Sequence, residues 1–121
     1  MKKNIVEYVY DIDEFMKIVD KNSRVHYMFF HDFDEKCLTW CEAGIVLFGV
    51  SKERHIVKCE ISRKVSWTDK ELDEKYKDVH NLLDRYNLWI HDTQKDLLKE
   101  IKEKLLKEYS IEITPGKYEY K

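Results

Sequence analysis

Glycine and proline are scarce in this sequence, with three Gly and one Pro among 121 residues. The glycines stand apart at positions 44, 49 and 116 and form no glycine-rich run. Loops that cradle phosphates in nucleotide-binding proteins need closely spaced glycines, because the backbone must approach the phosphates. A nucleotide-binding loop of the usual kind is therefore all but excluded, and no Gly-x-Ser-x-Gly nucleophile elbow is present.

Long apolar runs are also lacking. No segment approaches the roughly 18 consecutive apolar residues of a transmembrane helix. Acidic residues, beginning with Glu7 and Asp11, interrupt the apolar residues that follow the basic start, so we expect no secretory signal. Three cysteines, an odd number, then indicate free thiols in a reducing compartment, and the expected localisation is cytoplasmic.

Neither sign of charge predominates, although charged residues make up 38% of the chain. Lys and Arg number 22 against 24 Asp and Glu, which leaves a net charge of −2. Generic nucleic-acid and membrane-surface binders are usually basic, so we expect neither membrane association nor direct nucleic-acid binding. The length and the hydrophobic fraction of 43% are those of one packed domain over residues 1–121.

The stretch from residue 67 to 109 contains neither Gly nor Pro and carries the clearest secondary-structure signal. Apolar residues alternate there at steps of four and three, which predicts one side of an amphipathic helix: Leu72, Tyr76, Val79, Leu83, Tyr86 and Ile90. Thr68 stands at the N-cap, and Glu71 completes a capping box. Trp67 and Leu72 can pack together as a hydrophobic staple.

A break in this stretch is expected between Asn87 and Asp92-Thr93, which divides it into helices at about 69–86 and 93–109. One unbroken helix is the alternative, because the apolar spacing continues to Leu97.

β-branched and aromatic runs predict strands at 4–10, 24–31, 37–42, 45–50 and 55–65, with a short helix after Asp11. The run 45–50 is typical of a strand buried on both faces, and Gly44 before it indicates a bend or bulge. Pro115-Gly116 in the β-like tail predicts a type II turn. The expected fold is α+β: a mainly antiparallel sheet of about four to five strands, with the short N-terminal helix and the long C-terminal helical pair packed on it.

Metal-binding residue types are present, but their spacing is unfavourable for a site. His31, Asp32, Asp34 and Glu60 could hold a divalent cation in a small nuclease. However, Ser62 stands where the Glu-x-Lys pattern of restriction-endonuclease-like families needs lysine. Cys37 and Cys41 would lie about 13 Å apart along a strand, too far for one zinc ion. We therefore expect no metal, no cofactor and no catalytic set.

Basic and aromatic residues are the better candidates for binding. The predicted ligand- or partner-binding residues are Arg54, Lys58, Arg63, Lys64, Trp89 and His91. The four basic residues give the strand 55–65 and the turn before it a local positive excess that suits phosphate or acidic groups. Trp89 and His91 lie in the expected joint between the two helices, and tryptophan is frequent in protein-binding hot spots.

These features favour a small, non-enzymatic binding protein that engages a protein partner or sequesters a nucleotide-like ligand. The abundance of Lys, Ile and Tyr is typical of AT-rich genomes, which makes a phage or mobile-element accessory protein that inhibits a host defence system a reasonable class. A structural or regulatory homodimer, with the helices as its interface, is the alternative. A small metal-dependent nuclease or hydrolase is the second alternative.

Overall fold

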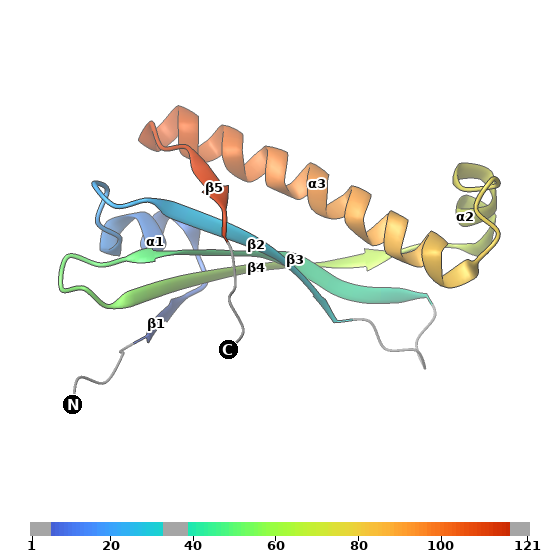
Figure 1. The fold of residues 1–121 in the computed structure, drawn as a ribbon, viewed down its shortest axis with the longest axis horizontal. Coiled ribbons are helices and arrows are strands. Elements are labelled where there is room, and N and C mark those ends of the chain that lie inside the picture. The colour runs from blue at the N-terminus through green and yellow to red at the C-terminus, as the bar shows by residue number, and fades with distance from the viewer. Residues whose placement is uncertain (1–5, 33–38, 117–121) are drawn as a thin grey trace.

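The computed structural model describes residues 6–32 and 39–116. A five-stranded sheet forms one layer, and a long helix runs along one of its faces (Figure 1). The elements follow in the order β1 (Val6–Val9), α1 (Ile12–Ile18), β2 (Val25–Asp32), β3 (Trp40–Val50), β4 (Ile56–Ser66), α2 (Asp69–Lys75), α3 (Leu82–Tyr109) and β5 (Ile113–Pro115). The predicted α+β class is confirmed.

The sheet is mixed, which corrects the expectation of a mainly antiparallel one. Its strand order is β1-β4-β3-β2-β5, and β3 pairs antiparallel with both β2 and β4. The two edge pairings, β1 with β4 and β2 with β5, are parallel. The parallel pairings result from helical crossovers: α1 joins β1 to β2, and α2 with α3 joins β4 to β5. Each crossover returns the chain to the end of the sheet where the previous strand began.

β3 is one continuous strand, where a bend at Gly44 was expected. Gly44 pairs in regular register with Phe30 on one side and Ser62 on the other. A Cβ atom at this position would lie 1.9 Å from the carbonyl oxygen of Ile61. Glycine is therefore needed for the close approach of two backbones and not for a bulge.

The type II turn predicted at Pro115-Gly116 is wrong. Pro115 ends β5 as the partner of Tyr27, and Gly116 lacks the positive φ that the third residue of such a turn requires. The two tail tyrosines lie outside the described residues.

The helical stretch does divide in two, but the predicted position of the break is wrong. α2 ends at Lys75, and Tyr76 leaves the helical conformation with φ −123° and ψ 37°. α3 begins after Asn81, whose side-chain oxygen accepts hydrogen bonds from Leu83 N at 2.9 Å and Asp84 N at 3.3 Å. The helix then continues through residues 87–92 without interruption. Asparagine can cap a helix, as Asn81 does, or occupy an exposed position within it, as Asn87 does. The residue type alone therefore could not show which of the two begins α3.

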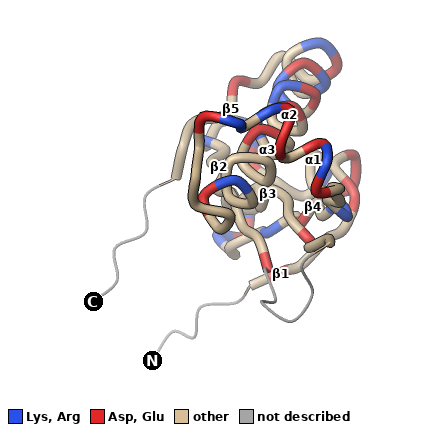
Figure 2. Tube along the Cα trace, turned by 90° about the vertical axis from the view of Figure 1, so that its right-hand side faces the viewer, with Lys and Arg blue, Asp and Glu red and all other residues tan. Residues whose placement is uncertain are grey.

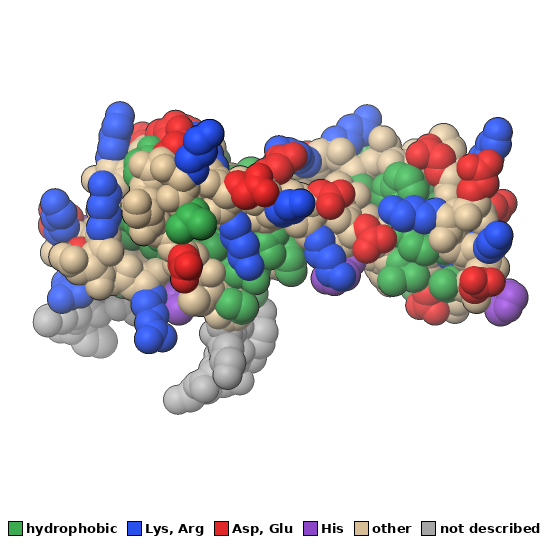
Figure 3. Space-filling view, turned by 90° about the horizontal axis from the view of Figure 1, so that it is seen from above, with side chains coloured by type: hydrophobic (Ala, Val, Ile, Leu, Met, Phe, Trp, Pro, Cys, Tyr) green, Lys and Arg blue, Asp and Glu red, His purple; other side chains and the backbone are tan. Residues whose placement is uncertain are grey.

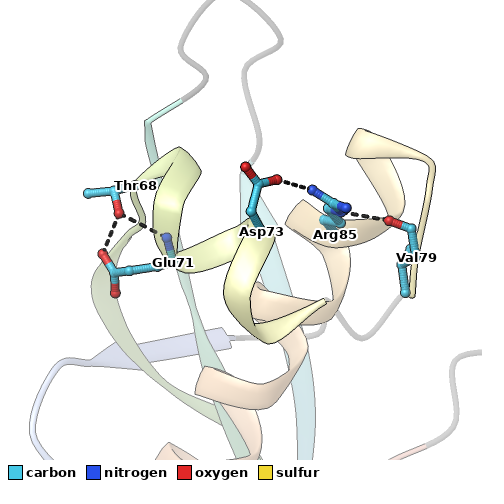
Figure 4. Close-up of polar contacts among 5 residues, drawn as sticks. All are labelled: Thr68, Glu71, Asp73, Val79 and Arg85. Carbon is cyan, nitrogen blue, oxygen red and sulfur yellow. Dashed lines mark hydrogen bonds and ion pairs between the residues drawn. The ribbon is translucent and has the colours of Figure 1, made fainter. Parts of the chain in front are cut away.

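The predicted start of α2 is confirmed. Thr68 Oγ1 accepts a hydrogen bond from Glu71 N at 3.2 Å, and the Thr68 hydroxyl donates to Glu71 Oε1 at 2.9 Å (Figure 4). The second bond differs from a standard capping box, in which the glutamate accepts from the N-cap backbone. Trp67 and Leu72 are both buried in one apolar cluster, as the predicted staple requires.

The core lies between the sheet and the three helices and has two parts. The larger cluster joins α1, the C-terminal half of α3 and the odd-numbered residues of β2, β3 and β4. The smaller cluster lies under α2 and the start of α3. α3 contributes to both through one buried stripe: Tyr86, Ile90, Gln94, Leu97, Ile101 and Leu105.

Gln94 is the polar member of this stripe. It is 4% exposed, and its Nε2 donates to the carbonyl oxygen of Phe30 at 2.7 Å. β5 pairs only with residues 25–27 of β2, so the carbonyl of Phe30 lies beyond the end of β5. The buried Gln94 amide thus has a backbone acceptor on β2, which offsets the cost of burying a polar side chain.

The close approach at Gly44 gives a first testable prediction. Gly44→Ala places a methyl group against the backbone of Ile61, so β3 and β4 must separate locally. We expect a loss of about 2–4 kcal/mol in the free energy of unfolding, measured by urea denaturation. Ser62→Ala, at the exposed partner position, is the control and should change stability by less than about 0.5 kcal/mol. Equal effects of the two substitutions would contradict this explanation.

Candidate functional site

One face of the sheet points away from all three helices (Figure 1). We call it the open face, and it carries the even-numbered residues of β2, β3 and β4 because side chains alternate along a strand. Its centre is apolar and half-buried, with Met28 and Phe30 from β2 and Val46, Phe48 and Val50 from β3. No helix or strand formed by residues 6–32 and 39–116 lies over it.

Exposed aromatic and aliphatic side chains extend this apolar centre. Ile56 on β4 is 37% exposed, and Tyr8 on the neighbouring β1 is 61% exposed. Tyr8 pairs in register with Lys58, which itself pairs with Phe48. At the opposite end of β3, Trp40 is 38% exposed. The apolar surface therefore crosses the sheet from β1 to β2.

Charged residues of both signs border the apolar centre. Glu42 on β3 has Lys64 on one side and Asp32 on the other. The Lys64 ammonium lies 4.9 Å from the centre of the Trp40 ring, a cation–π contact. Glu60 lies beside Val46 on β4. The border thus carries both charge signs, which suits recognition of a partner with matching polar groups.

The structure separates the four basic residues that were predicted to act together. Lys58 and Lys64 lie on the open face, but Arg63 points to the helix side, because neighbouring residues of a strand face opposite ways. There its Nη2 donates to Glu100 Oε2 of α3 at 2.6 Å. Arg54 lies in the turn between β3 and β4, exposed and with φ 68°. Only the two lysines share a surface.

Trp89 and His91 lie inside α3 and do not form a joint. Trp89 is half-buried, with its ring 6.5 Å edge-on from that of Tyr76 and the Lys75 ammonium 5.0 Å away. His91 is exposed, and its ring contacts Phe29 of β2 edge-on at 5.8 Å. Residues two apart on a helix point in different directions, so these two side chains do not form one site.

The link between α2 and α3 is held by polar contacts. Arg85 forms an ion pair with Asp73, and its Nε donates to the carbonyl oxygen of Val79 at 2.6 Å (Figure 4). The Tyr76 hydroxyl donates to Asp92 Oδ2 at 2.5 Å. Burial, followed by this bond to the carboxylate, raises the pKa of Tyr76, so its hydroxyl stays protonated as a donor. These contacts hold the N-terminal turns of α3 in place.

The residues of the metal alternative are not brought together. His31 and Asp32 project to opposite faces of β2, and Glu60 lies two strands away on β4. Asp34 lies outside the described residues. Within the described ranges, no group of three His, Cys, Asp or Glu side chains is close enough to hold a metal ion.

The two described cysteines are buried in the core. Cys41 belongs to the smaller apolar cluster and Cys59 to the larger one. Burial raises the pKa of the Cys59 thiol to about 12, so the nucleophilic thiolate is almost absent at neutral pH. Cys37 lies outside the described residues.

Charged residues of both signs are interspersed along the helices (Figure 2). Among the described helices, none is both long and apolar enough to span a membrane. No family model, curated protein or solved structure matches this chain. Any functional conclusion therefore depends on the surfaces themselves.

The Tyr76–Asp92 bond predicts a measurable contribution to stability. Tyr76→Phe removes the hydroxyl and leaves the Asp92 carboxylate without this donor, which should lower the free energy of unfolding by about 1–3 kcal/mol. Tyr10→Phe, which alters a 79% exposed side chain, is the matched control and should have almost no effect. Thermal unfolding followed by circular dichroism compares the two. Similar melting temperatures for both variants would show that the bond does not hold the junction.

Proposed function

We propose that this chain is a non-enzymatic protein-binding module whose docking surface is the open face of the sheet. The observation that carries the proposal is the composition of β3. Its residues 45–50 are apolar on both faces, yet only Ile45, Leu47 and Gly49 are buried against the helices. On the open face, Val46, Phe48 and Val50 are half-buried: no described helix covers them, although Gly116 lies against the Phe48 ring.

A solvated sheet face normally carries polar side chains, because one apolar face suffices to build the core. After its first residue, Ile56, β4 follows this rule, with Lys58, Glu60, Ser62 and Lys64 outward. β3 departs from it with Val46, Phe48 and Val50. Each apolar side chain transferred from water into an interface contributes of the order of 1 kcal/mol or more. A partner that covers this centre thus gains from side chains that the described part of the chain leaves half-buried.

Aromatic and charged residues supply selectivity around this centre. Trp40 and Tyr8 are exposed residue types that dominate binding hot spots. Lys58, Lys64 and Glu60 favour a partner whose charges complement theirs. A protein with an apolar patch and polar groups of both signs fits this surface better than a nucleic acid. Inhibition of a host system by occupying such a partner, in the cytoplasm, is the form of this function that the composition favours.

The homodimer alternative receives less support in its predicted form. The apolar stripe of α3 already packs on the sheet of its own chain. The large apolar side chains of α3 that remain exposed are Leu82, Leu83 and Leu88 near its start and Leu106 near its end. A homodimer could also form through the open face. Sedimentation velocity would then show a dimer of this chain in place of a complex with a different protein.

Charge placed on the open face tests the proposal. We expect Val46→Lys with Ile56→Lys to weaken partner binding at least tenfold, because two ammonium groups would enter the buried centre of the interface. Leu82→Lys is the control, since Leu82 is exposed and lies on α3, away from this face. Tagged proteins are purified from the source cells, and co-purifying proteins are quantified by mass spectrometry. The identified partner is then titrated against each purified variant.

Circular dichroism of all variants verifies that they fold. Sedimentation velocity of the wild type distinguishes a second copy from a different protein. A partner retained by the open-face variant, or lost equally by Leu82→Lys, would place the docking surface elsewhere.

A further inference from the structure

A groove of about 460 Å³ lies at one end of the molecule, where three parts of the chain meet. The end of α1 and the turn after it form one side, the β3–β4 turn forms another, and Tyr109 at the end of α3 closes it. Two contacts hold the turns together. Val19 forms a β-bridge with Ser51, and Asp20 N donates to the carbonyl oxygen of Val50 at 2.7 Å. The groove is thus part of the folded framework.

Three lysines line this groove: Lys17, Lys21 and Lys52. The acid in the lining is Asp20, and its Oδ1 accepts a hydrogen bond from Asn22 N at 3.0 Å. Seen from the helix side, Lys and Arg side chains gather at the end of the molecule opposite α2 (Figure 3). The groove therefore concentrates positive charge in a chain whose net charge is −2.

These lysines differ from basic residues elsewhere in the molecule. Arg63, Arg85, Lys75 and Lys104 each form an ion pair with a carboxylate. Within the described residues, Lys17, Lys21 and Lys52 form no ion pair within 4 Å, and Lys21 instead lies 5.8 Å from the centre of the Tyr109 ring. The three ammonium groups in the groove are thus not neutralised by an ion pair with a described carboxylate.

The nearest acid of α1 is occupied by other partners. Asp13 accepts a hydrogen bond from the Tyr109 hydroxyl, and the Lys104 ammonium lies 3.5 Å from it. The hydrogen bond from Tyr109, more than the lysine, lowers the pKa of Asp13. The same bond raises the pKa of Tyr109, which stays a neutral phenol. Lys104 offsets part of the charge of Asp13, and the groove residue Lys17 also contributes to lowering its pKa, so Asp13 is shared between Lys104 and the edge of the groove.

We infer that this groove binds the phosphate groups of a small di- or triphosphate. Lysine ammonium groups are point donors that bind phosphate oxygens, and three of them match the charge of two or three phosphates better than that of a single carboxylate. The buried Met16 and Val19 lie beneath them as an apolar floor, which strengthens the field in the groove. Its volume is that of a small-molecule site.

The inference is independent of the proposed function, because the groove lies on the helix side and the proposed docking surface is the open face. The phosphates could come from inorganic pyrophosphate or from a nucleotide. Both present the same chemistry to the lysines, and the experiment has an arm for each.

Amide chemical shifts of ¹⁵N-labelled full-length protein test the inference during titration with pyrophosphate, ATP or adenosine. We expect pyrophosphate and ATP to shift amides of residues 17–24 and 51–54, and adenosine to leave them unchanged. Lys17→Ala with Lys21→Ala and Lys52→Ala should weaken binding at least tenfold. Lys70→Ala with Lys95→Ala and Lys99→Ala changes the net charge equally at exposed positions outside the groove and should preserve binding.

Each other outcome is decisive. Shifts with pyrophosphate alone support the phosphate site and exclude a nucleotide as its source. Equal weakening by both triple variants would show a general charge effect and overturn the inference. Equal shifts with adenosine, or none at these amides with any compound at millimolar concentration, would overturn it as well. Unchanged circular dichroism spectra verify that both variants fold.

Discussion

The packing of α3 along one face of the sheet is the constraint from which the rest of the structure follows. This helix has 28 residues and spans roughly 42 Å at 1.5 Å per residue, so it reaches both apolar clusters. Its buried stripe from Tyr86 to Leu105 covers the odd-numbered residues of the central strands. Because α3 returns the chain to the end of the sheet where β4 began, β5 must join β2 in parallel. A shorter helix would leave one of the two clusters uncovered.

The two surfaces proposed to bind ligands are consequences of the same arrangement. With every described helix on the other side of the sheet, no described helix covers the even-numbered residues of β3, and four of these, Trp40, Val46, Phe48 and Val50, are apolar. The end of α3 also completes the lysine-lined groove, because Tyr109 reaches Asp13 on α1. The opposite end of α3 is held to α2 by Arg85 and Tyr76. The surfaces that pack the core and those proposed for binding therefore lie on different sides of the same elements.

Local signals in the sequence predicted much of the fold. The N-cap at Thr68 and the alternation of Val57, Cys59 and Val65 are confirmed, because both depend on neighbouring residues alone. Long-range features were not predictable in this way. The parallel edges depend on crossovers, and the glycine at 44 is needed by a strand that is distant in sequence. Gln94 was missed because a polar residue gives no hydrophobic signal, although it occupies a buried helical position.

The candidate site was less predictable than the fold. Arg63 and Lys64 are adjacent in sequence, but strand alternation places them on opposite faces. Lys17, Lys21 and Lys52 carry no motif, and Lys52 joins the others only through the Val19–Ser51 bridge. Conversely, the run 45–50 predicted a strand that is buried on both faces. Because the described helices cover only its odd-numbered residues, the even-numbered apolar residues of the same run mark the open face.

Solvent exposure of the two faces of β3 and its neighbours tests the central claim most directly. A soluble gadolinium chelate, added to dilute protein with labelled methyl groups, accelerates the relaxation of methyls in proportion to their exposure. We expect strong effects on the methyls of Met28, Val46 and Ile56, and weak effects on those of Ile45, Leu47 and Val57. Equal protection of the two sets in monomeric protein would mean that the open face is covered within the chain, which would contradict its proposed role as a docking surface.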